Sequence, residues 1–524
     1  MIVDFNQTHA EAELQADVCI IGAGAAGITI AREFIDSGFS VILLESGGLE
    51  FEQQTQDLYE GEIGGLPYDL TANRLRFFGG TTNHWGGLCA PLDDIDFVSR
   101  SWVANSGWPI ARDKLVTFYK RAHEVCRVGQ FLYGNDVWRH TEIRRVNFDP
   151  AKLEYIFKTL NLPPLRFGDA YADHLKKASN VQVFLHANVV NIHQSDDGRR
   201  VAHVDVRSLQ GKSGRISARY FVLACGALEN ARLLLVSNSQ EAAGVGNRND
   251  VVGRYFIEHP QFWVGLVFPK AGKILRANFA PIFIEGIRLV QHLRATPEFQ
   301  RRNRILNSII FLEEILKPDT GIAAARDIMQ ALRDNSKNFN NLDEKVWRIL
   351  MDIDEVGVNA WRRFILGRST LPPVERIELQ VESEQVPDAD SRVTLTANRD
   401  VLGLNRLRLK WVMSGQETQT AITLANLLAA EFGRLGLGRV KLDEEIRYGK
   451  DPSNPHCYCH QMGTTRMAEN PKNGVVDPNC RVHGLENIYI AGSSVFPTGG
   501  AVNPTLTIVA LALRMSDQLK AKLR

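Results

Sequence analysis

The sequence predicts an α/β protein of two parts: a parallel sheet covered by helices, and a second part built on an antiparallel sheet with attached helices. Three observations lead to this prediction. A glycine-rich turn between an apolar run and a helical pattern lies near the start of the chain. Apolar, strand-like runs that end in small residues return at distant positions. The middle of the chain is rich in short β-type stretches.

The glycine-rich turn has the pattern of a dinucleotide-binding site. Gly22, Gly24, Ala26 and Gly27 follow a buried-strand run that ends at Ile21. Glycines here allow a tight turn, close approach of the backbone to a pyrophosphate and close packing of a helix on a strand. The helix N-terminus then offers free N–H groups to the phosphates. We therefore predict a Rossmann-like domain that binds a dinucleotide.

A second predicted strand supports this interpretation. It runs from Ser40 to Leu44 and ends at Glu45 and Ser46. In dinucleotide-binding domains an acid at the end of this strand accepts hydrogen bonds from a ribose. Strand, turn, helix, second strand and acid therefore stand in the order that such a domain requires. A glycine turn that only packs a helix on a sheet is the alternative.

The bulk composition excludes several classes of function. The chain has 524 residues and a net charge of +1, so nothing in its charge favours nucleic acid or an anionic membrane. No apolar stretch is long enough to span a membrane, and the first residues lack the apolar core of a secretion signal. Seven cysteines do not make a disulfide scaffold. We expect a cytoplasmic protein with room for two domains.

The strand-like runs are far apart, so the nucleotide-binding domain must be discontinuous. Beyond the N-terminal strands, such runs lie at residues 181–190, 220–227 and 487–492. The predicted boundaries are 1–100, 176–260 and 446–524 for the nucleotide-binding domain, and 101–175 and 261–445 for a second, substrate-facing domain.

A charged stretch with helical periodicity, about residues 296–365, interrupts the second domain. It contains Ile309 to Phe311, Ile328, Leu332 and Trp347. We predict a helical insertion at this place. A lid, an oligomer contact, a partner-docking surface and a simple surface elaboration are all compatible with this pattern.

Five motifs make the chain similar to a known family. They are the turn GAGAAG with its acid, the loop GGTTNHWGG, the run CGALENARLLL, the segment VGRYFIEHP, and the C-terminal pair HQMGTT and NPTLT. With these motifs the chain resembles the glucose–methanol–choline (GMC) oxidoreductases over nearly its whole length. It is more similar to the branch with pyranose oxidase, glycoside oxidases and sugar dehydrogenase flavin subunits than to glucose oxidase or choline oxidase. Glu229 and Asn230 replace the usual small hydroxyl and proline residues of the second family signature, which leaves the substrate subclass open.

The resemblance implies FAD as the cofactor and a Rossmann-like FAD-binding domain beside the substrate domain. In pyranose oxidase the histidine that matches His84 is bonded to the flavin. We expect noncovalent FAD here, with His84 close to the ring, and a covalent link through His84 is the alternative. Besides the turn and Glu45-Ser46, the residues that match family cofactor positions or suit close cofactor contact are Gly80, Thr81, Asn83, His84, Gly86, Gly87, Val189, Ala224, Gly226, Gly492, Ser493, Asn503, Pro504 and Thr505.

His460 and Asn503 carry the predicted chemistry. Oxidation of an alcohol removes a hydride from carbon, which flavin accepts, and a proton from oxygen, which a neutral imidazole is suited to accept. His460 matches the family base, and Asn503 matches its partner, whose amide donates to the substrate oxygen. We expect both to contact the substrate, with Gln385 as a third contact by analogy with pyranose-oxidase-like enzymes. His456 is a weaker candidate for the base, and His259 matches a structural family position.

The predicted function is FAD-dependent oxidation of an alcohol group of a sugar, glycoside or related polyol to the ketone or aldehyde. Oxidation of an apolar alcohol, such as a sterol or a long-chain alcohol, is the first alternative and would need an apolar cavity. A flavoprotein reductase or electron-transfer protein is the second alternative, and it would need a second glycine-rich nucleotide site, which the sequence lacks. The sequence predicts no metal site. It leaves open a homo-oligomer and the electron acceptor, which is oxygen, a quinone or a redox protein.

Overall fold

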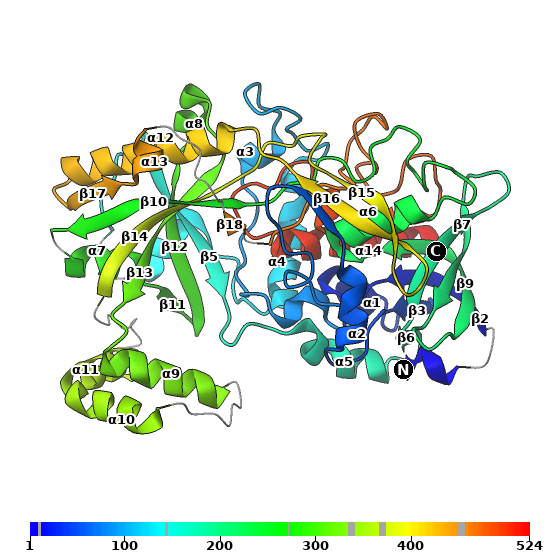
Figure 1. Ribbon diagram of the computed structural model, residues 1–524, viewed down its shortest axis with the longest axis horizontal. Coiled ribbons are helices and arrows are strands. Elements are labelled where there is room, and N and C mark those ends of the chain that lie inside the picture. Colours follow the sequence, from blue (N-terminus) through cyan, green and yellow to red (C-terminus); the bar gives the residue numbers. More distant parts are fainter. Residues whose placement is uncertain are drawn as a thin grey trace.

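The computed structural model describes residues 1–8, 12–141, 145–270, 272–333, 341–365, 374–448, 456–457 and 459–524. Two large sheets lie side by side (Figure 1). The sheet that contains the N-terminal strands lies at the end of the molecule where both chain termini are found, and the second sheet occupies the other end. The predicted combination of a Rossmann-like domain with an antiparallel sheet and helices is confirmed.

The first sheet has a parallel centre. Strand β2 pairs in parallel with β3 on one side and with β9 on the other, and the parallel pairing continues from β3 to β6 and β1. The short strand β19 joins β9 in parallel, while β8 and β7 extend the sheet as an antiparallel meander. The strands are β1 (Ile2–Asp4), β2 (Ala12–Ile21), β3 (Val41–Leu44), β6 (Val181–Leu185), β7 (Asn188–Gln194), β8 (Val201–Arg207), β9 (Ser213–Leu223) and β19 (Ile488–Ile490).

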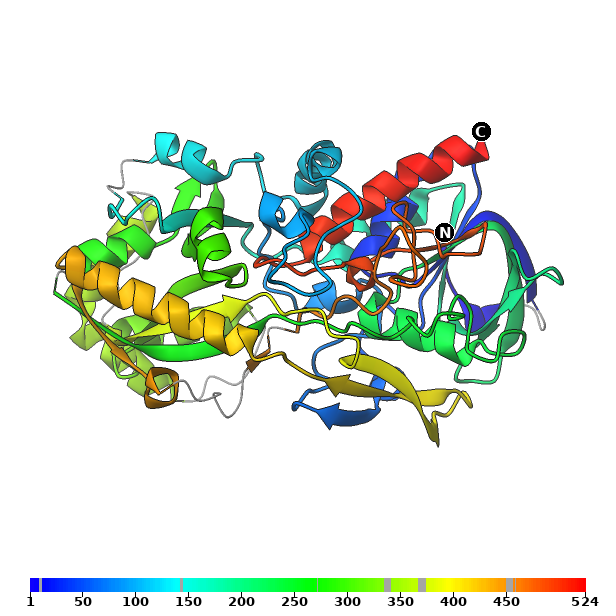
Figure 2. The same cartoon turned by 90° about the horizontal axis from the view of Figure 1, so that it is seen from above.

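Helices from distant parts of the chain pack around this sheet. The C-terminal helix α14 packs on α4 and α1, and α1 also packs on α5. Figure 2 shows α14, in red, running from the centre of the molecule to the end that holds the first sheet. No helix in the described ranges is long and apolar enough to cross a membrane. The helices of this part are α1 (Ala25–Glu33), α4 (Asp113–Cys126), α5 (Phe167–Lys177), α6 (Gly226–Val236) and α14 (Thr505–Leu523).

The second sheet is antiparallel in all its pairings. Its order is β11–β12–β13–β14–β10–β17, with β5 beside β12 and β18 beside β10. The long helix α12 (Gln416–Arg434) packs on β10, β14 and β17 and buries Leu424 and Leu428 against them. The strands are β5 (Leu153–Leu160), β10 (Pro260–Pro269), β11 (Ile282–Ile284), β12 (Ile287–Ala295), β13 (Ser308–Leu316), β14 (Val374–Ser383), β17 (Gly438–Leu442) and β18 (His456–Cys457).

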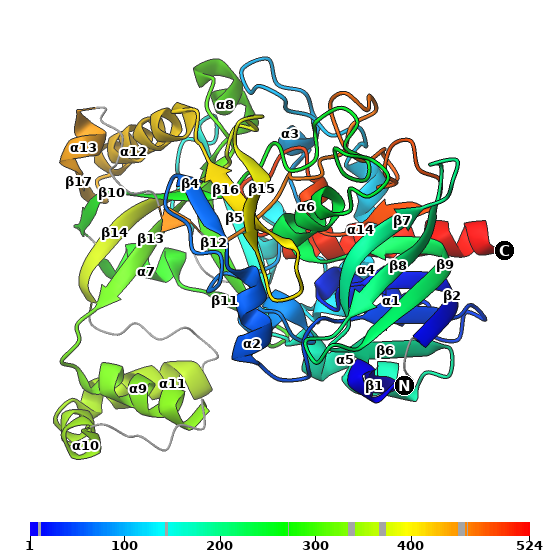
Figure 3. The same ribbon diagram turned by 45° about the vertical axis from the view of Figure 1, so that its right-hand side comes forward.

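A small third sheet lies between the two large ones (Figure 3). In it β16 (Asn405–Trp411) pairs in parallel with β4 (Glu62–Gly65) and antiparallel with β15 (Arg392–Arg399). It joins residues that we assigned to different domains, and the predicted domain boundaries stay a prediction. The remaining short elements are α2 (Gln53–Gln56), α3 (Asp94–Phe97), α7 (Gly272–Phe279), α8 (Pro297–Asn303), α13 (Glu444–Arg447) and the 3₁₀ turns η1 (Phe5–Gln7), η2 (Asp57–Tyr59), η3 (Gly80–Asn83), η4 (Gly134–His140) and η5 (Ser493–Val495).

The predicted helical insertion needs one correction. Ile309 to Phe311 belong to strand β13, which pairs with β14 over most of its length. These apolar, mostly β-branched or aromatic residues suit the centre of a sheet, where Ile309 and Ile310 are buried. The helices α9 (Gly321–Arg333), α10 (Leu342–Met351) and α11 (Ile353–Phe364) follow and form a group apart from the sheet (Figure 1). Residues 334–340 of the predicted insertion lie outside the described residues.

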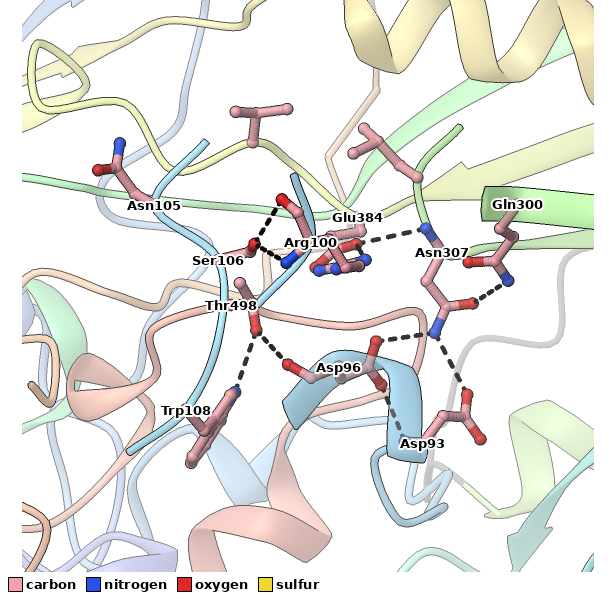
Figure 4. Close-up of polar contacts among 12 residues, drawn as sticks. Asp93, Asp96, Arg100, Asn105, Ser106, Trp108, Gln300, Asn307, Glu384 and Thr498 are labelled. Atoms are coloured by element: carbon pink, nitrogen blue, oxygen red, sulfur yellow. Dashed lines mark hydrogen bonds and ion pairs between the residues drawn. The ribbon is translucent and has the colours of Figure 1, made fainter. Parts of the chain in front are cut away.

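A buried polar network joins the second sheet to α3 and to the loop before α14 (Figure 4). Both terminal nitrogens of Arg100 donate to the carboxylate of Glu384, each at 2.7 Å. Asn307 N also donates to Glu384, and Asn307 Nδ2 donates to Oδ1 of Asp96 at 2.8 Å. Thr498 Oγ1 donates to the carbonyl oxygen of Asp96. The loop that leads to α14 is therefore tied to the end of β14. Burial raises the pKa of Asp96 to about 7, and the negative charge of Glu384 adds to this effect.

The Arg100–Glu384 pair should be important for stability. Arg100→Met leaves Glu384 buried without its counter-charge, and such a change costs about 3–5 kcal/mol. We expect a clear fall in the midpoint of thermal unfolding, measured by tryptophan fluorescence. Arg301→Met breaks the exposed pair with Glu298 and should leave the midpoint unchanged. Equal midpoints for the two variants would contradict this role.

Candidate active site

A cavity of about 490 Å³ lies at the carboxyl ends of the parallel strands β2 and β3. Ligands of doubly wound sheets bind at this edge. The C-terminal segment 492–505 contributes another wall. The predicted site residues in the lining are Gly22, Gly24, Ala26, Glu45, Ser46, Gly80, Thr81, His84, Gly86, Gly87, Val189, Ala224, Gly226, His460, Gly492, Ser493, Asn503, Pro504 and Thr505.

The turn before α1 requires glycine at two positions. Gly22 has a φ of 102°, and a Cβ there would lie 2.6 Å from the carbonyl oxygen of Ala224. A Cβ on Gly27 would lie 1.9 Å from the carbonyl oxygen of Gly22, so α1 packs directly on the end of β2. By contrast, no described atom lies within 4 Å of a Cβ built on Gly24, which precedes α1. The helix N-terminus therefore faces open space, as a bound pyrophosphate requires.

Glu45 both holds the turn and lines the cavity. Its Oε2 accepts a hydrogen bond from Ala23 N at 2.9 Å, and its Oε1 accepts one from Gly47 N at 3.1 Å. Ser46 Oγ also donates to Oε1, at 3.4 Å, whereas Oε2 keeps one acceptor position for a ribose hydroxyl, since a carboxylate oxygen has two lone pairs. The predicted ribose contact is therefore compatible with the structural role of the same side chain.

Several amide groups in the cavity wall need a polar ligand. Asn188 is 2% exposed, and neither Oδ1 nor Nδ2 has a hydrogen-bond partner among the described residues. The same holds for Nε2 of Gln461 and Oδ1 of Asn503 within the described ranges. All three residues line the cavity. An unpaired buried polar group costs about 1–3 kcal/mol, so this wall suits a ligand rich in hydrogen-bonding groups. The residues present therefore fit FAD.

His460 and Asn503 meet in this wall, as the sequence predicts. Asn503 Nδ2 lies 3.1 Å from His460 Nε2. The main chain of His460 is held by Glu258, whose Oε2 accepts from His460 N at 2.8 Å. Burial, with the charges of His259 and Lys158, lowers the pKa of His460 to about 3, although Glu382 opposes this shift. His460 is therefore a neutral imidazole at physiological pH, able to accept a proton.

A second histidine and a buried ion pair lie behind His460. His259 Nδ1 and His460 Nδ1 are 2.8 Å apart. Glu382 Oε1 lies 3.4 Å from His259 Nδ1 and 3.7 Å from His460 Nδ1. The other oxygen of Glu382 pairs with Lys158 Nζ at 3.2 Å. The alternative base, His456, pairs through its main chain in β18 with Gln261 of β10, and its side chain lies outside the described part of the structure.

Three predicted site residues, Gln385, Gly27 and Asn83, lie outside the cavity lining. Gln385 is fully buried: its Oε1 accepts from Glu258 N and Trp411 Nε1, and its Nε2 donates to the carbonyl oxygen of Val412. These bonds use both lone pairs of Oε1 and one of the two N–H groups of Nε2, so Gln385 supports the segment around Glu258, and its contact with substrate stays a prediction. Gly27 packs against Gly22, and Asn83 Nδ2 donates to the carbonyl oxygen of Phe78. Neither Gly27 nor Asn83 lines the cavity.

A charged cluster in the lining was missed by the sequence analysis. Glu229, noted only as a departure from the family signature, pairs with Arg74 at 3.1 Å, with Arg76 at 3.3 Å and with Arg232 at 3.4 Å. Burial by itself would raise the pKa of Glu229, but the three arginines lower it to about 2. Glu229, Arg76 and Arg232 all line the cavity. In the sequence, the only indication of this charged cluster was Glu229 itself, an acid at a position where the family signature has a different residue.

Two families match the chain. Residues 17–242 match the family described as "FAD dependent oxidoreductase", and residues 387–512 match "GMC oxidoreductase". A curated relative, "Fructose dehydrogenase large subunit" of Gluconobacter japonicus, is 21% identical over 97% of this chain and 98% of its own. Another, "Long-chain-alcohol oxidase FAO4A" of Arabidopsis thaliana, is 22% identical over 97% of this chain and 70% of its own.

A solved structure has the same fold. The crystal structure of formate oxidase superposes with a TM-score of 0.58 at 16% sequence identity and covers 98% of this chain and 99% of its own. The glycine turn, the cavity and the family matches define an FAD-dependent oxidoreductase. Residues 387–512 match the GMC oxidoreductase family, and the predicted resemblance to that family is confirmed.

The unpaired amide of Asn188 should contact FAD. Asn188→Leu keeps the side-chain volume but leaves a cofactor polar group unpaired, so we expect the FAD dissociation constant to rise roughly 10-fold. Quenching of FAD fluorescence during reconstitution of the apoprotein measures this constant. Asn191→Leu, three residues along the same strand and outside the cavity lining, is the control and should bind FAD as tightly as the original protein. An unchanged constant for Asn188→Leu would refute the contact.

His84 lines the cavity as predicted, and the bond between His84 and the cofactor stays open to experiment. Burial lowers the pKa of His84, and the positive charge of Arg166 adds to this effect. We expect FAD without a covalent link. After acid precipitation the yellow colour should stay in the supernatant, and denaturing mass spectrometry should give the mass of the chain alone. A yellow pellet with the mass of one added FAD would establish the covalent alternative.

Proposed function

We propose that this protein catalyses FAD-dependent oxidation of an alcohol group of a sugar, glycoside or related polyol to the ketone or aldehyde. The observation that carries the proposal is the pair of His460 and Asn503, whose side chains lie 3.1 Å apart in the wall of the cavity that fits FAD. A binding protein on this fold would not require a buried neutral imidazole beside an amide donor at this place.

The two side chains have complementary tasks. FAD, when bound, supplies the acceptor for the hydride that leaves the alcohol carbon. His460 is neutral, and its Nε2 can take the hydroxyl proton. Asn503 Nδ2 donates to the single lone pair of His460 Nε2 in the structure, so the substrate hydroxyl has to replace that hydrogen bond, and Asn503 Nδ2 can then donate to the substrate oxygen as negative charge develops there. Glu258 holds the main chain of His460, which keeps the base in position.

A second cavity supports a polar substrate. It has a volume of about 920 Å³ and lies along one face of the second sheet. Its wall includes Gln261, Gln380, Glu313 and His292 beside the aromatic rings of Trp263 and Phe311. Gln261 is the cross-strand partner of Glu382, whose Oε1 lies 3.7 Å from His460 Nδ1, so one residue of this wall is a strand away from the carboxylate behind the base.

This combination favours a sugar over an apolar alcohol. Amide, carboxylate and imidazole groups next to exposed aromatic faces suit a ring that carries hydroxyl groups on its edge and C–H groups on its faces. The relative that acts as a fructose dehydrogenase agrees with this substrate class. The long-chain-alcohol oxidase keeps the apolar alternative in the test, but such a chain would place apolar surface against the amide and carboxylate groups of the second cavity wall.

An anaerobic reduction experiment tests the proposal. The purified protein is mixed without oxygen with monosaccharides, glycosides, a sterol and long-chain alcohols, and flavin absorbance is followed. Bleaching by sugars or glycosides supports the proposal, whereas bleaching by the apolar alcohols alone would overturn the substrate class. Admission of air, a quinone or a redox protein then identifies the electron acceptor by the rate of reoxidation.

Substitution of the two central side chains should separate chemistry from cofactor binding. We expect His460→Ala to slow anaerobic flavin reduction about 100-fold or more, since a positioned base contributes 10²–10⁴-fold. Asn503→Ala should slow it roughly 10- to 1000-fold through loss of one oriented donor. Stopped-flow absorbance measures the rate, and the visible spectrum of each variant checks that FAD is retained. If either variant reduces its flavin at the original rate, the role assigned to the substituted residue is wrong.

A further inference from the structure

The histidine behind the base is set in place by strand pairing. Ile257 and Met462 exchange both main-chain hydrogen bonds as an antiparallel pair. Two residues further on, the same pairing brings His259 opposite His460, and the two Nδ1 atoms lie 2.8 Å apart. His259 and Glu382 are buried, as is Lys158, which pairs with Glu382. We propose that the proton accepted by His460 is passed to His259 across this Nδ1–Nδ1 contact and held there by the carboxylate of Glu382. This inference rests on the proposed function.

The contacts define which nitrogens carry hydrogen. Asn503 Nδ2 is a donor, so Nε2 of a neutral His460 is an acceptor and its hydrogen is on Nδ1. That N–H can then donate to Nδ1 of His259, whose own hydrogen is on Nε2. In this arrangement the Nε2 lone pair of His460 lies on the cavity side, where the substrate hydroxyl takes the place of Asn503 Nδ2, and an acceptor for the Nδ1 proton lies behind the ring.

The proton transfer is balanced within the two rings. One N–H bond forms at His460 Nε2 as the substrate O–H bond breaks. A second N–H bond forms at His259 Nδ1 as the bond at His460 Nδ1 breaks. His460 ends neutral and His259 ends as an imidazolium, so the transfer moves one positive charge away from the substrate without any further reactant.

Glu382 is placed to hold that charge. Its Oε1 lies 3.4 Å from His259 Nδ1, closer than to His460 Nδ1 at 3.7 Å. The carboxylate therefore favours the proton on His259, the ring that does not face the substrate. Lys158 limits this effect because its ammonium group pairs with the second oxygen of Glu382 and repels the imidazolium. The pKa of Glu382 is held low, below that of an ordinary glutamate, by Lys158 and the two histidines despite its burial.

Other titratable groups also face the two rings. Asp96 from α3 and His292 from β12 interact electrostatically with members of the cluster. Burial and the neighbouring Cys457 raise the pKa of Glu258 to about 8, and its Oε2 accepts from the main-chain N–H groups of His259 and His460. The described charged or titratable groups around the pair are therefore Asp96, Lys158, Glu258, His292, Glu382, Cys457 and Cys459. Among these described groups, Glu382 is the carboxylate that lies within 4 Å of both Nδ1 atoms, and Lys158 is its paired cation.

Substitutions of Glu382 and Lys158 should have opposite effects on the histidine pair, and this difference tests the proposal. Glu382→Gln removes the counter-charge, so anaerobic flavin reduction should slow at least about 10-fold at neutral pH. Lys158→Met removes the opposing cation, so the histidine pair should accept protons more readily. In the wild-type protein, the reduction rate falls below a certain pH. In Lys158→Met that pH should be higher by about one pH unit or more. A purely structural role would slow both variants without moving the acid limb of the pH profile, and this result would overturn the proposal.

A second measurement does not depend on turnover. Selective ¹⁵N-histidine labelling of the holoenzyme reports protonation at each ring nitrogen, with His259→Asn as the assignment variant. We expect the coupled His259–His460 signals to titrate at higher pH in Lys158→Met than in the original protein. Separate, uncoupled titration of the two rings would refute the proton transfer. It would leave the proposed function intact, which depends instead on the effect of His460→Ala.

Two further variants control for folding. The double variant Lys158→Gln, Glu382→Gln leaves no unpaired buried charge. It should slow flavin reduction as much as Glu382→Gln alone. If the double variant reduces its flavin at the original rate, the role assigned to Glu382 is wrong. Glu384→Gln changes a buried carboxylate two residues along the same strand, which pairs with Arg100 and lies outside the histidine cluster. It should lower thermal stability but leave the acid limb of the pH profile in place. A shifted limb in Glu384→Gln would show that any buried carboxylate of this strand has the effect, contrary to the proposal.

Discussion

The structure depends on the need of buried charges for partners around the end of β14. Within the second sheet, Glu382 of β14 pairs with Lys158 of β5, and just beyond β14 Glu384 pairs with Arg100 near α3. Gln385 binds Trp411 of the small third sheet and the main chain of Glu258. Removing one partner of such a charge pair leaves an uncompensated charge at a cost of several kcal/mol. The end of β14 is therefore held in one arrangement, and the base lies beside it.

The cofactor half could be predicted from sequence because its signals are local. The turn from Gly22 to Gly27 and the acid Glu45 follow directly from strand ends, and the structure places them around one cavity. Asn188, Gln385 and the group behind His460 could not be predicted in the same way. Their roles come from strands of the second sheet or from unpaired atoms in a wall, and no spacing along the chain indicates either. The strand at Ile309 was mistaken for helix because the charged helical stretch that surrounds it dominated the pattern.

The bulk charge of the chain gives no information about the site. Its net charge is +1. Yet Lys158, Glu382, Arg100 and Glu384 are all buried, and Glu229 lies among three arginines in the cavity wall. Burial strengthens each of these interactions and shifts the pKa values that matter for chemistry, such as that of His460. The net charge of the chain gives no sign of these interactions, because the charges are paired in the interior of the enzyme.

The distribution of the cavity wall along the chain has a consequence for biosynthesis. Ribosomes make Gly22 and Glu45 early, whereas His460, Ser493 and Asn503 come late, and α14 must still pack on α1 and α4. A nascent chain can form the glycine turn and β2–β3 but lacks the opposite wall and the edge strand β19 beside β9. Stable cofactor loading therefore belongs to the period after release from the ribosome. Until then the newly made protein has the phosphate cradle but no means of performing chemistry.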